Sequence, residues 1–303
     1  MQYDLNARNS RVGRRHFLKT ASLSLGTLGL AETSLPAATP QPSLAQPSRL
    51  RLGTVTYNIA KDWDVPTIIK NCEATKFEGV ELRTTHAHGV EVSLTADQRA
   101  EVGRRFRDSK VALMGLGSIF DYHTPDQEKL KRDLAATKEY ILLARDVGAP
   151  GVKVRPNGIP KEVPKEKTLE QIGHSLREIG IFGEEHGIQI RLEVHGGESQ
   201  LLPNIRRMLD VADHKNVGVC WNTNSTDLDG DGFDHNFDLV KDKIFTVHLH
   251  DLFDETYPFR RLFTRLNEAG KTCFCLAEIP ESSDPLRVMR YFRTNFLAYQ
   301  NLL

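Results

Sequence analysis

Cysteine is scarce in this 303-residue chain, which has only four and no Cys-x-x-Cys pair. Such a low number, placed in apolar runs, argues against a disulfide framework and favours small buried side chains. An excess of one charge sign is also missing, because 40 basic residues face 40 acidic ones. This balance gives no support for a nucleic-acid partner, and we expect none. The four cysteines are Cys72, Cys220, Cys273 and Cys275.

The N-terminal apolar stretch is too short for a membrane anchor. It runs from Ala21 to Ala31, whereas a permanent transmembrane helix needs about 20 residues. Arg14-Arg15 precedes it, and a Pro/Ala/Ser-rich segment follows, in which Ser43-Leu44-Ala45 resembles a cleavage site. This order predicts a twin-arginine signal over residues 1–45, the Tat export machinery as a partner, and a periplasmic or secreted protein. The alternative is a disordered basic tail.

The rest of the chain, residues 46–303, has the length of one (β/α)₈ barrel, a fold of roughly 250 residues. Eight strand-like apolar runs alternate there with helical patterns, which predicts a parallel sheet closed into a single-domain TIM barrel. The first 45 residues hold five basic and two acidic residues, so this part carries a formal charge of about −3. The predicted strands are Arg51–Ile59, Gly79–Arg83, Lys110–Gly117, Gly151–Arg155, Gln189–His195, Val217–Asn222, Phe245–His250 and Thr272–Ile279.

Three helix starts carry local signals. Thr95 and Gln98 have the spacing of a capping box. Thr124-Pro125 predicts a second start, with proline at the first helical position. Asp284-Pro285 predicts the start of the last helix in the same way.

Polar and apolar residues alternate along five of the predicted strands. With Glu193 pointing inward, Arg191 and His195 share its face, and Leu192 and Val194 face the helices. Because a parallel sheet is normally covered on both sides, the polar face is predicted to line the barrel near its C-terminal mouth. The same rule places inward Glu81 and Arg83, Lys153 and Arg155, His248 and His250, and Glu278.

Two carboxylates and an imidazole end three of these strands, namely Glu193, His248 and Glu278. A charged side chain is costly to bury without a partner, so several at one rim favour a common ligand. Oxygen and nitrogen donors together suit Mn²⁺, Mg²⁺, Co²⁺ or Zn²⁺. Asn222, at the end of the sixth strand, would add a carbonyl oxygen. The sequence thus predicts one divalent metal ion, whereas each residue alone is equally explained by ordinary hydrogen bonding.

With these residues, the sequence resembles the xylose-isomerase-like barrels, the sugar phosphate isomerases and epimerases. In that family a strand-five Glu, a strand-six Asp, a strand-seven His and a strand-eight Glu bind one divalent metal. The resemblance implies this role for Glu193, Asn222, His248 and Glu278. The family's Asp-x-x-His of strand six is absent, since Asn222 replaces the Asp and Ser225 stands where the His would be. The resemblance rests on Gly79–Leu82, Leu192–His195, Val247–Asp251 and Ala277–Glu278.

The resemblance implies a metal-dependent sugar isomerase or epimerase that works through an enediolate. Glu193 and Glu278 would remove and return the proton beside the substrate carbonyl. Because phosphorylated sugars are expected to be scarce outside the cytoplasm, we expect a free sugar or keto-sugar as substrate. The remaining candidates, taken as substrate-binding, are His195, Lys153, Arg155, Glu81 and His250.

Other readings stay open at this stage. Lys153 and Arg155 are equally explained as charge balance for Glu81 and Glu193. A lyase or hydrolase of keto-glycosides would use the same metal site. The loss of the strand-six Asp favours a non-catalytic carbohydrate-binding barrel instead. An endonuclease of the related barrel type is disfavoured, because it would need more zinc ligands and a basic face. The chain could also form a homo-oligomer.

An acidic stretch after the sixth strand begins like an EF-hand loop, with Asp227, Asp229 and Asp231 at alternate positions and Asp238 at the twelfth. Asp replaces the usual bidentate Glu, and no helix leads into the loop. A solvated acidic turn and a calcium site are the two interpretations.

Overall fold

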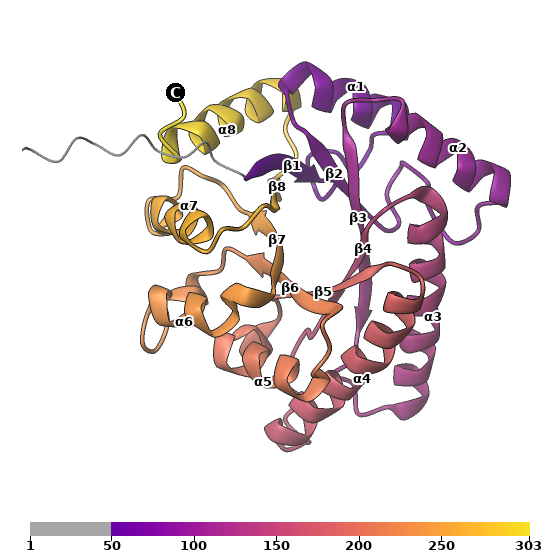
Figure 1. The fold of residues 1–303 in the computed structure, drawn as a ribbon, viewed down its shortest axis with the longest axis vertical. Helices are drawn as coiled ribbons and strands as arrows, with labels where there is room; N and C mark the ends of the chain where they lie inside the picture. The colour runs from indigo at the N-terminus through magenta and orange to yellow at the C-terminus, as the bar shows by residue number, and fades with distance from the viewer. Residues whose placement is uncertain (1–49) are drawn as a thin grey trace, which may run out of the picture. The chain divides into compact units, whose positions relative to one another are not determined.

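Eight parallel strands form a closed barrel in the computed structural model, which describes residues 50–303. Each strand pairs with the next one, and β8 pairs with β1, so the sheet has no free edge. Figure 1 shows the strands as an inner ring inside a ring of helices. The predicted TIM barrel is confirmed. The strands are β1 (Arg51–Val55), β2 (Gly79–Arg83), β3 (Ala112–Asp121), β4 (Gly151–Arg155), β5 (Gln189–Glu193), β6 (Val217–Asn222), β7 (Ile244–Leu249) and β8 (Phe274–Ala277).

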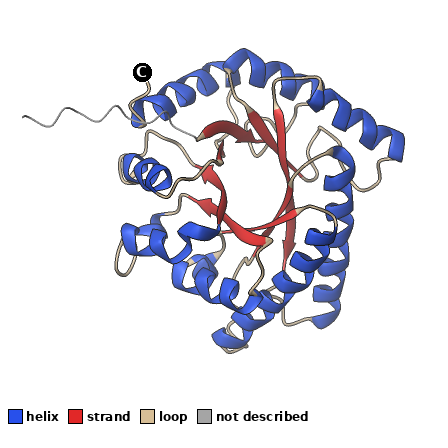
Figure 2. Cartoon of the chain, in the orientation of Figure 1, coloured by secondary structure: helices blue, strands red, loops and turns tan. Residues whose placement is uncertain are grey.

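A helix follows every strand and covers its outer side, as the blue ring around the red barrel in Figure 2 shows. Three short 3₁₀ helices complete the loops. The α-helices are α1 (Val65–Thr75), α2 (Ala96–Arg107), α3 (Gln127–Val147), α4 (Lys165–Glu185), α5 (Leu202–Ala212), α6 (Phe233–Val240), α7 (Phe259–Glu268) and α8 (Pro285–Tyr299). The 3₁₀ helices are η1 (Gly197–Gln200), η2 (Ser225–Leu228) and η3 (Lys241–Lys243).

The predicted helix starts have different outcomes. Thr95 forms the capping box of α2 with Gln98, and Asp284 caps α8 with proline at its first position, so both predictions are confirmed. The start at Thr124-Pro125 is wrong. Asp126 is the N-cap of α3, because its carboxylate accepts the backbone amides of two residues in the first turn.

The main core lies between the barrel and the helices. Outward apolar residues of the strands pack there against the helix faces, among them Val80, Val152, Leu192 and Val247. A second, smaller cluster on the inward face holds Val55, Phe274 and Leu276, with Ala112 and Met114 beside them. The inside of the barrel is therefore apolar at one level, and the ionisable residues lie toward the C-terminal ends of the strands.

Several strand ends differ from the prediction. The third strand starts two residues later and continues to Asp121, with an irregular register after Gly117. The fifth strand ends at Glu193, so His195 belongs to the loop that follows. Between residues 50 and 303 we find no helix with both the length and the apolar character needed to cross a membrane. The predicted signal of residues 1–45 lies outside the described residues.

Candidate metal centre and active site

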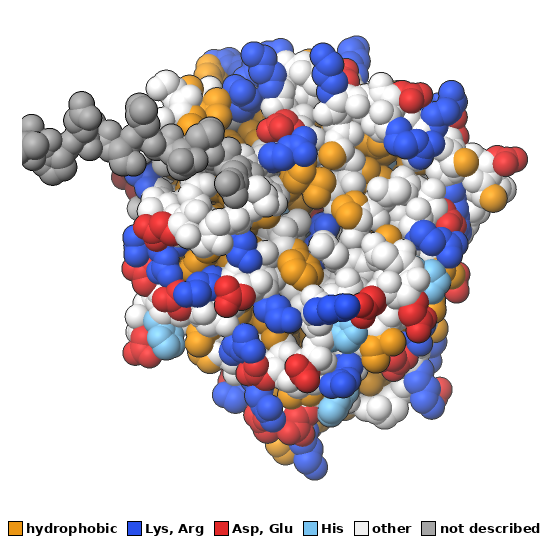
Figure 3. Space-filling view, viewed as in Figure 1, with side chains coloured by type: hydrophobic (Ala, Val, Ile, Leu, Met, Phe, Trp, Pro, Cys, Tyr) orange, Lys and Arg blue, Asp and Glu red, His pale blue; other side chains and the backbone are white. Residues whose placement is uncertain are grey.

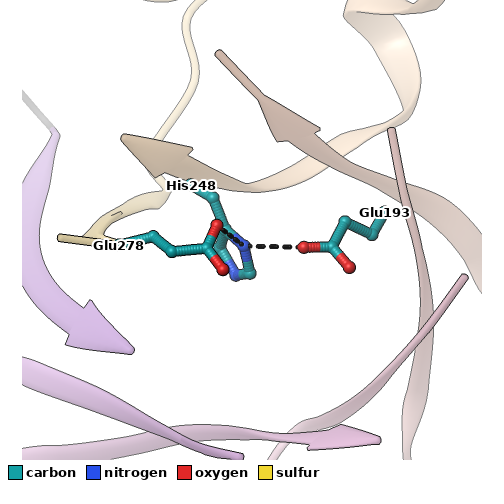
Figure 4. Close-up of side chains that lie close together, drawn as sticks. All are labelled: Glu193, His248 and Glu278. Atoms are coloured by element: carbon teal, nitrogen blue, oxygen red, sulfur yellow. Dashed lines mark hydrogen bonds and ion pairs between the residues drawn. The ribbon is translucent and has the colours of Figure 1, made fainter. Parts of the chain in front are cut away.

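Glu193, His248 and Glu278 come together at the mouth of the barrel from three different strand ends. One ligand atom from each lies within 4.8 Å of the others. The imidazole Nδ1 is 3.1 Å from Oε1 of Glu193 and 3.3 Å from Oε2 of Glu278. Figure 4 shows the two carboxylates approaching the imidazole from opposite sides. Among the described residues, this is the single set of three histidine, cysteine or carboxylate ligands that could hold a metal ion.

The barrel register fixes these three positions. Glu193 is the last residue of β5, and His248 is the fifth of the six residues of β7. Glu278 directly follows β8, and its backbone amide donates to the Leu249 carbonyl at 2.8 Å, which ties it to the neighbouring strand. Parallel strands end at one rim, so residues far apart in the chain meet there.

Asn222, the last residue of β6, lies opposite His248 in the strand register. Its side chain is buried, and its Oδ1 has no hydrogen-bond partner. An unpaired buried carbonyl oxygen is costly unless a ligand meets it. The preceding Trp221 points the other way and donates its indole N–H to the Tyr257 hydroxyl at 3.0 Å. The donors at this rim are thus two carboxylates, one imidazole and one amide oxygen, a set that fits a divalent cation.

Glu81 of β2 lies on the other side of the imidazole. Its Oε1 is 3.2 Å from Nε2 of His248, and its side chain is completely buried. Gly115 and Gly117 on β3 make room for it, because a Cβ at Gly117 would come within 2.9 Å of Glu81 Oε1. Glu81 is thus within ion-pair distance of Nε2, although the two atoms do not form a hydrogen bond, and it occupies the place that acceptors have behind metal-bound histidines.

Lys153 of β4 is buried and donates to Oε2 of Glu193 at 2.7 Å. Burial opposes ionisation of Glu193, but Lys153 and His248 outweigh it and lower the pKa of Glu193 to about 2. Burial likewise opposes ionisation of Glu278, and His248, His250 and Lys153 hold its pKa well below the usual range. Both carboxylates are therefore ionised at neutral pH.

Two cavities open at this rim and share Tyr57, His195 and Glu278 as their common wall. The first, about 340 Å³, carries mainly neutral polar groups, and we call it the amide cavity. The second, about 120 Å³, carries three cationic side chains, and we call it the cationic cavity. The amide cavity is further lined by Asn58, Gln200, Asn222, Asn224 and His250. The cationic cavity is further lined by Arg83, Lys153, Arg155 and Glu193.

The remaining predicted site residues divide between these cavities. His195 lies between them, and its Nδ1 is buried without a hydrogen-bond partner. Arg155 lines the cationic cavity, and His250 lines the amide cavity with Nε2 at 3.7 Å from Glu278. Glu81 lines neither cavity, so its place behind His248 distinguishes it from the other residues expected to bind substrate.

Sequence reasoning did not select Arg83, Tyr57 or Gln200 as site residues, although each lines a cavity. For Arg83 a signal existed, since it ends β2 on the same face as Glu81. Tyr57 and Gln200 lie in loops, where strand alternation gives no direction.

The acidic stretch after β6 does not gather its carboxylates around one point. Asp227 is buried and accepts the Tyr257 hydroxyl at 2.6 Å. Asp238 is the sixth residue of α6 and pairs with Lys241 and Arg265. The calcium interpretation therefore finds no support in the described residues, and Asp227 instead supports the end of β6 by accepting the Asn224 amide. Burial raises the pKa of Asp227 to about 8.

Solved structures with the same fold include several sugar epimerases. The chain is similar to the 3-keto-D-glucoside 4-epimerase YcjR from E. coli, with a TM-score of 0.68, 15% identity, and coverage of 83% of this chain and 99% of that one. It is similar to an L-ribulose 3-epimerase, with a TM-score of 0.70, 15% identity and coverage of 83% and 95%. It is also similar to the IOLI protein with a bound zinc atom, with a TM-score of 0.69, 14% identity and coverage of 82% and 97%.

At these identities the likeness shows the fold alone. The comparison with curated protein sequences gave no match. Residues 69–293 match the family described as Xylose isomerase-like TIM barrel, which extends from α1 through α8 and includes all three converging ligands. The chain belongs to the Xylose isomerase-like TIM barrel family.

Proposed function

We propose that the protein is a divalent-metal-dependent sugar isomerase or epimerase. The observation that carries the proposal is the convergence of Glu193, His248 and Glu278 within 4.8 Å, beside the unpaired Oδ1 of Asn222. These four side chains would hold Mn²⁺, Co²⁺, Mg²⁺ or Zn²⁺. The bound zinc of the IOLI structure and the epimerase activities of the other two similar structures support this proposal.

A cation at this position supplies Lewis acidity toward the negative charge that develops on a sugar carbonyl and its neighbouring hydroxyl. The residues of the chain supply the proton transfers. Glu278 is the better placed base, because it lines both cavities, whereas Glu193 lines only the cationic one. One ionised carboxylate could take the proton from the carbon beside the carbonyl and so become a carboxylic acid. It could return this proton to the neighbouring carbon in an isomerisation, whereas in an epimerisation the opposite face would receive a proton that the other carboxylate had first taken from solvent.

Other residues orient the substrate. Lys153 holds one oxygen of Glu193 and so directs the other toward His248. His195 stands between the cavities with a free ring nitrogen, which suits a hydrogen bond to a sugar hydroxyl. The side-chain amides of the amide cavity offer donors and acceptors for further hydroxyls. We therefore expect a keto-sugar to lie across both cavities with its reacting carbons at Glu278.

Exchange with solvent deuterium tests the function. Metal-loaded protein is incubated in D₂O with D-fructose, D-tagatose, L-ribulose and a 3-keto-glucoside, and the substrates are followed by NMR. The proposal predicts deuterium at the carbon next to the carbonyl, and loss of this exchange in Glu278→Gln. Release of an aglycone would instead indicate glycoside cleavage. Absence of both reactions, in a protein whose melting temperature ignores added metal, would indicate a non-catalytic sugar-binding barrel.

We also propose export of this enzyme through the twin-arginine (Tat) machinery, on the basis of Arg14-Arg15 and the apolar stretch after it. Replacing both arginines by lysine is expected to keep the protein in the cytoplasm. Fractionation and mass spectrometry of the exported chain would check this, with a new N-terminus after Ala45 as the expected result. An unprocessed chain in the cytoplasm of the unaltered strain would contradict it.

A further inference from the structure

Two strands on one side of the barrel end in the same way. β2 reads Gly-Val-Glu-Leu-Arg and β4 reads Gly-Val-Lys-Val-Arg, so each ends with an arginine, Arg83 and Arg155. The strands flank β3, where Gly117 pairs in register with both Arg83 and Lys153. Gly117 has no side chain beside Arg83, and after an irregular stretch of β3 the register partner of Arg155 is Asp121. Both arginines line the cationic cavity.

Neither arginine has a carboxylate partner among residues 50–303, in contrast to Lys153, which pairs with Glu193. Arg83 donates to three neutral acceptors, the Thr84 carbonyl at 3.1 Å, the Thr85 hydroxyl at 3.2 Å and the His86 ring at 3.5 Å. Burial and the charge of Arg83 lower the pKa of His86 to about 4, so this ring is neutral at pH 7. No acceptor of Arg83 among the described residues therefore carries a negative charge.

Arg155 is held in the same way. One of its amino groups donates to the Ile119 carbonyl at 3.0 Å, and its Nε is buried without a hydrogen-bond partner. Arg83 also contacts the Tyr57 ring, whose centroid lies 5.3 Å from the Arg83 Cζ. Two guanidinium groups are thus pre-positioned by neutral contacts, and a planar fork of N–H donors matches the oxygens of a carboxylate or phosphate.

We propose that the cationic cavity binds an oxyanion group of the substrate. Because the exported protein would meet few phosphorylated sugars, the expected substrate is a sugar acid, and a sugar phosphate is the alternative that the experiment separates. This rests on the proposed function, since the cavity shares Glu278 and His195 with the amide cavity. The anion would sit against Arg83 and Arg155, and the hydroxylated part of the sugar would extend past Glu278 toward the amides. The small volume, about 120 Å³, admits one such group.

Affinities measured by calorimetry for matched neutral and anionic ketoses test the proposal, and this measurement does not depend on catalysis. The ligands are D-fructose, D-fructuronate and D-fructose 6-phosphate, and the corresponding D-tagatose series, with full-length protein at low salt. We expect at least one anionic ketose to bind about tenfold or more tightly than its neutral counterpart. A preference for the uronate identifies a sugar acid, and a preference for the phosphate identifies a sugar phosphate.

Variants of the two arginines test whether these residues cause the tighter binding of anionic ketoses. Arg83→Gln and Arg155→Gln should each remove most of it, with the affinity for the neutral ketose changed less than about twofold. Arg83→Lys keeps the positive charge but loses the planar pair of N–H donors, so it should retain part of the preference for anionic ketoses. Arg177→Gln, an exposed position on α4, is the matched control and should behave like the unaltered protein. Melting curves show whether each variant is folded.

The proposal is overturned if no anionic ketose in either series binds more tightly than its neutral counterpart. It is also overturned if the arginine variants weaken neutral and anionic ketoses equally, because the arginines would then act on the common part of the sugar. If instead the proposed function fails, the protein would still bind anionic ketoses more tightly than neutral ones, but no ketose would take up deuterium from solvent.

Discussion

The two cavities at the mouth of the barrel differ in charge although they share a wall. On the side of β2 and β4 the walls carry Arg83, Lys153 and Arg155, and on the side of β6 they carry Asn222 and Asn224. A cavity lined mainly by uncharged amides can bind hydroxyl groups in many orientations, whereas a cationic cavity fixes the negatively charged end of a molecule. Under the proposed function, this difference would orient the substrate by charge, with the carboxylates between the two cavities.

The replacement of the family's strand-six Asp by Asn222 fits this division. It removes a negative charge from the amide side, where Glu278 and Glu193 already face the imidazole. Figure 3 shows acidic and basic side chains interspersed over the face in view.

The largest effect is expected at the shared wall. Glu278→Gln should lower the rate of deuterium exchange by about 10³-fold, because it removes a base. Its melting temperature should stay close to that of the unaltered protein. Glu193→Gln should have a similar effect on the rate and also destabilise the fold, by roughly 3 kcal/mol, since buried Lys153 loses its partner.

Exchange kinetics and thermal melts measure both effects, with Glu178→Gln on the surface of α4 as control. If both variants retained full exchange, the two-carboxylate mechanism would be wrong.

Behind the imidazole, Glu81→Gln should weaken metal binding by about 10–100-fold. The reason is that Glu81 faces Nε2 of His248 and stabilises the tautomer that leaves Nδ1 free. Titration with Mn²⁺ checks this, with the same surface variant as control. An unchanged affinity would mean that Glu81 only balances the buried charge of Arg191.

On the amide side, Asn222→Asp restores the carboxylate typical of the family and should tighten Mn²⁺ binding by about tenfold, equivalent to about 1.4 kcal/mol. If a carboxylate at this position left the affinity unchanged, Asn222 would not be a ligand. The lower charge of the amide cavity would then be unrelated to metal binding.

A further prediction concerns the support of the amide cavity and leaves both the metal and the reaction rate unchanged. Burial raises the pKa of Asp227 to about 8, so the folded protein keeps its proton while the unfolded chain, with an ordinary carboxyl, loses it near pH 4. Stability contributed by this group is fully present below pH 4 and is lost as the pH rises to 8. Asp227→Asn mimics the protonated form, so it should match the unaltered protein near pH 4 and be the more stable one at pH 9. Urea unfolding at several pH values checks this, and parallel pH profiles would contradict it.

The sequence predicted the barrel and the convergence of its ligands, because both follow from short-range patterns. Alternation along a five-residue strand decides which side chains point inward, and strands of a closed parallel sheet end at one rim. The extent of β3 was less well predicted, since two of its inward positions, Gly115 and Gly117, carry no polar or apolar signal.

Pairing between side chains could not be predicted in this way. Alternation placed Glu81 and Arg83 on one face, but the stagger of neighbouring strands decides that Glu81 meets His248 and that Arg83 meets no carboxylate among the described residues. Asp227 gave the same difficulty. Its neighbours in the sequence suggested a calcium loop, whereas its actual partner, Tyr257, is 30 residues away.

Titration of the purified protein with Mn²⁺ tests the central claim most directly, namely that one cation is held by side chains from separate strands. The account predicts one Mn²⁺ per chain in the unaltered protein, and loss of this binding in His248→Ala and in the double variant Glu193→Gln, Glu278→Gln. Binding of no metal by the unaltered protein, or the same stoichiometry and affinity in these variants, would contradict it.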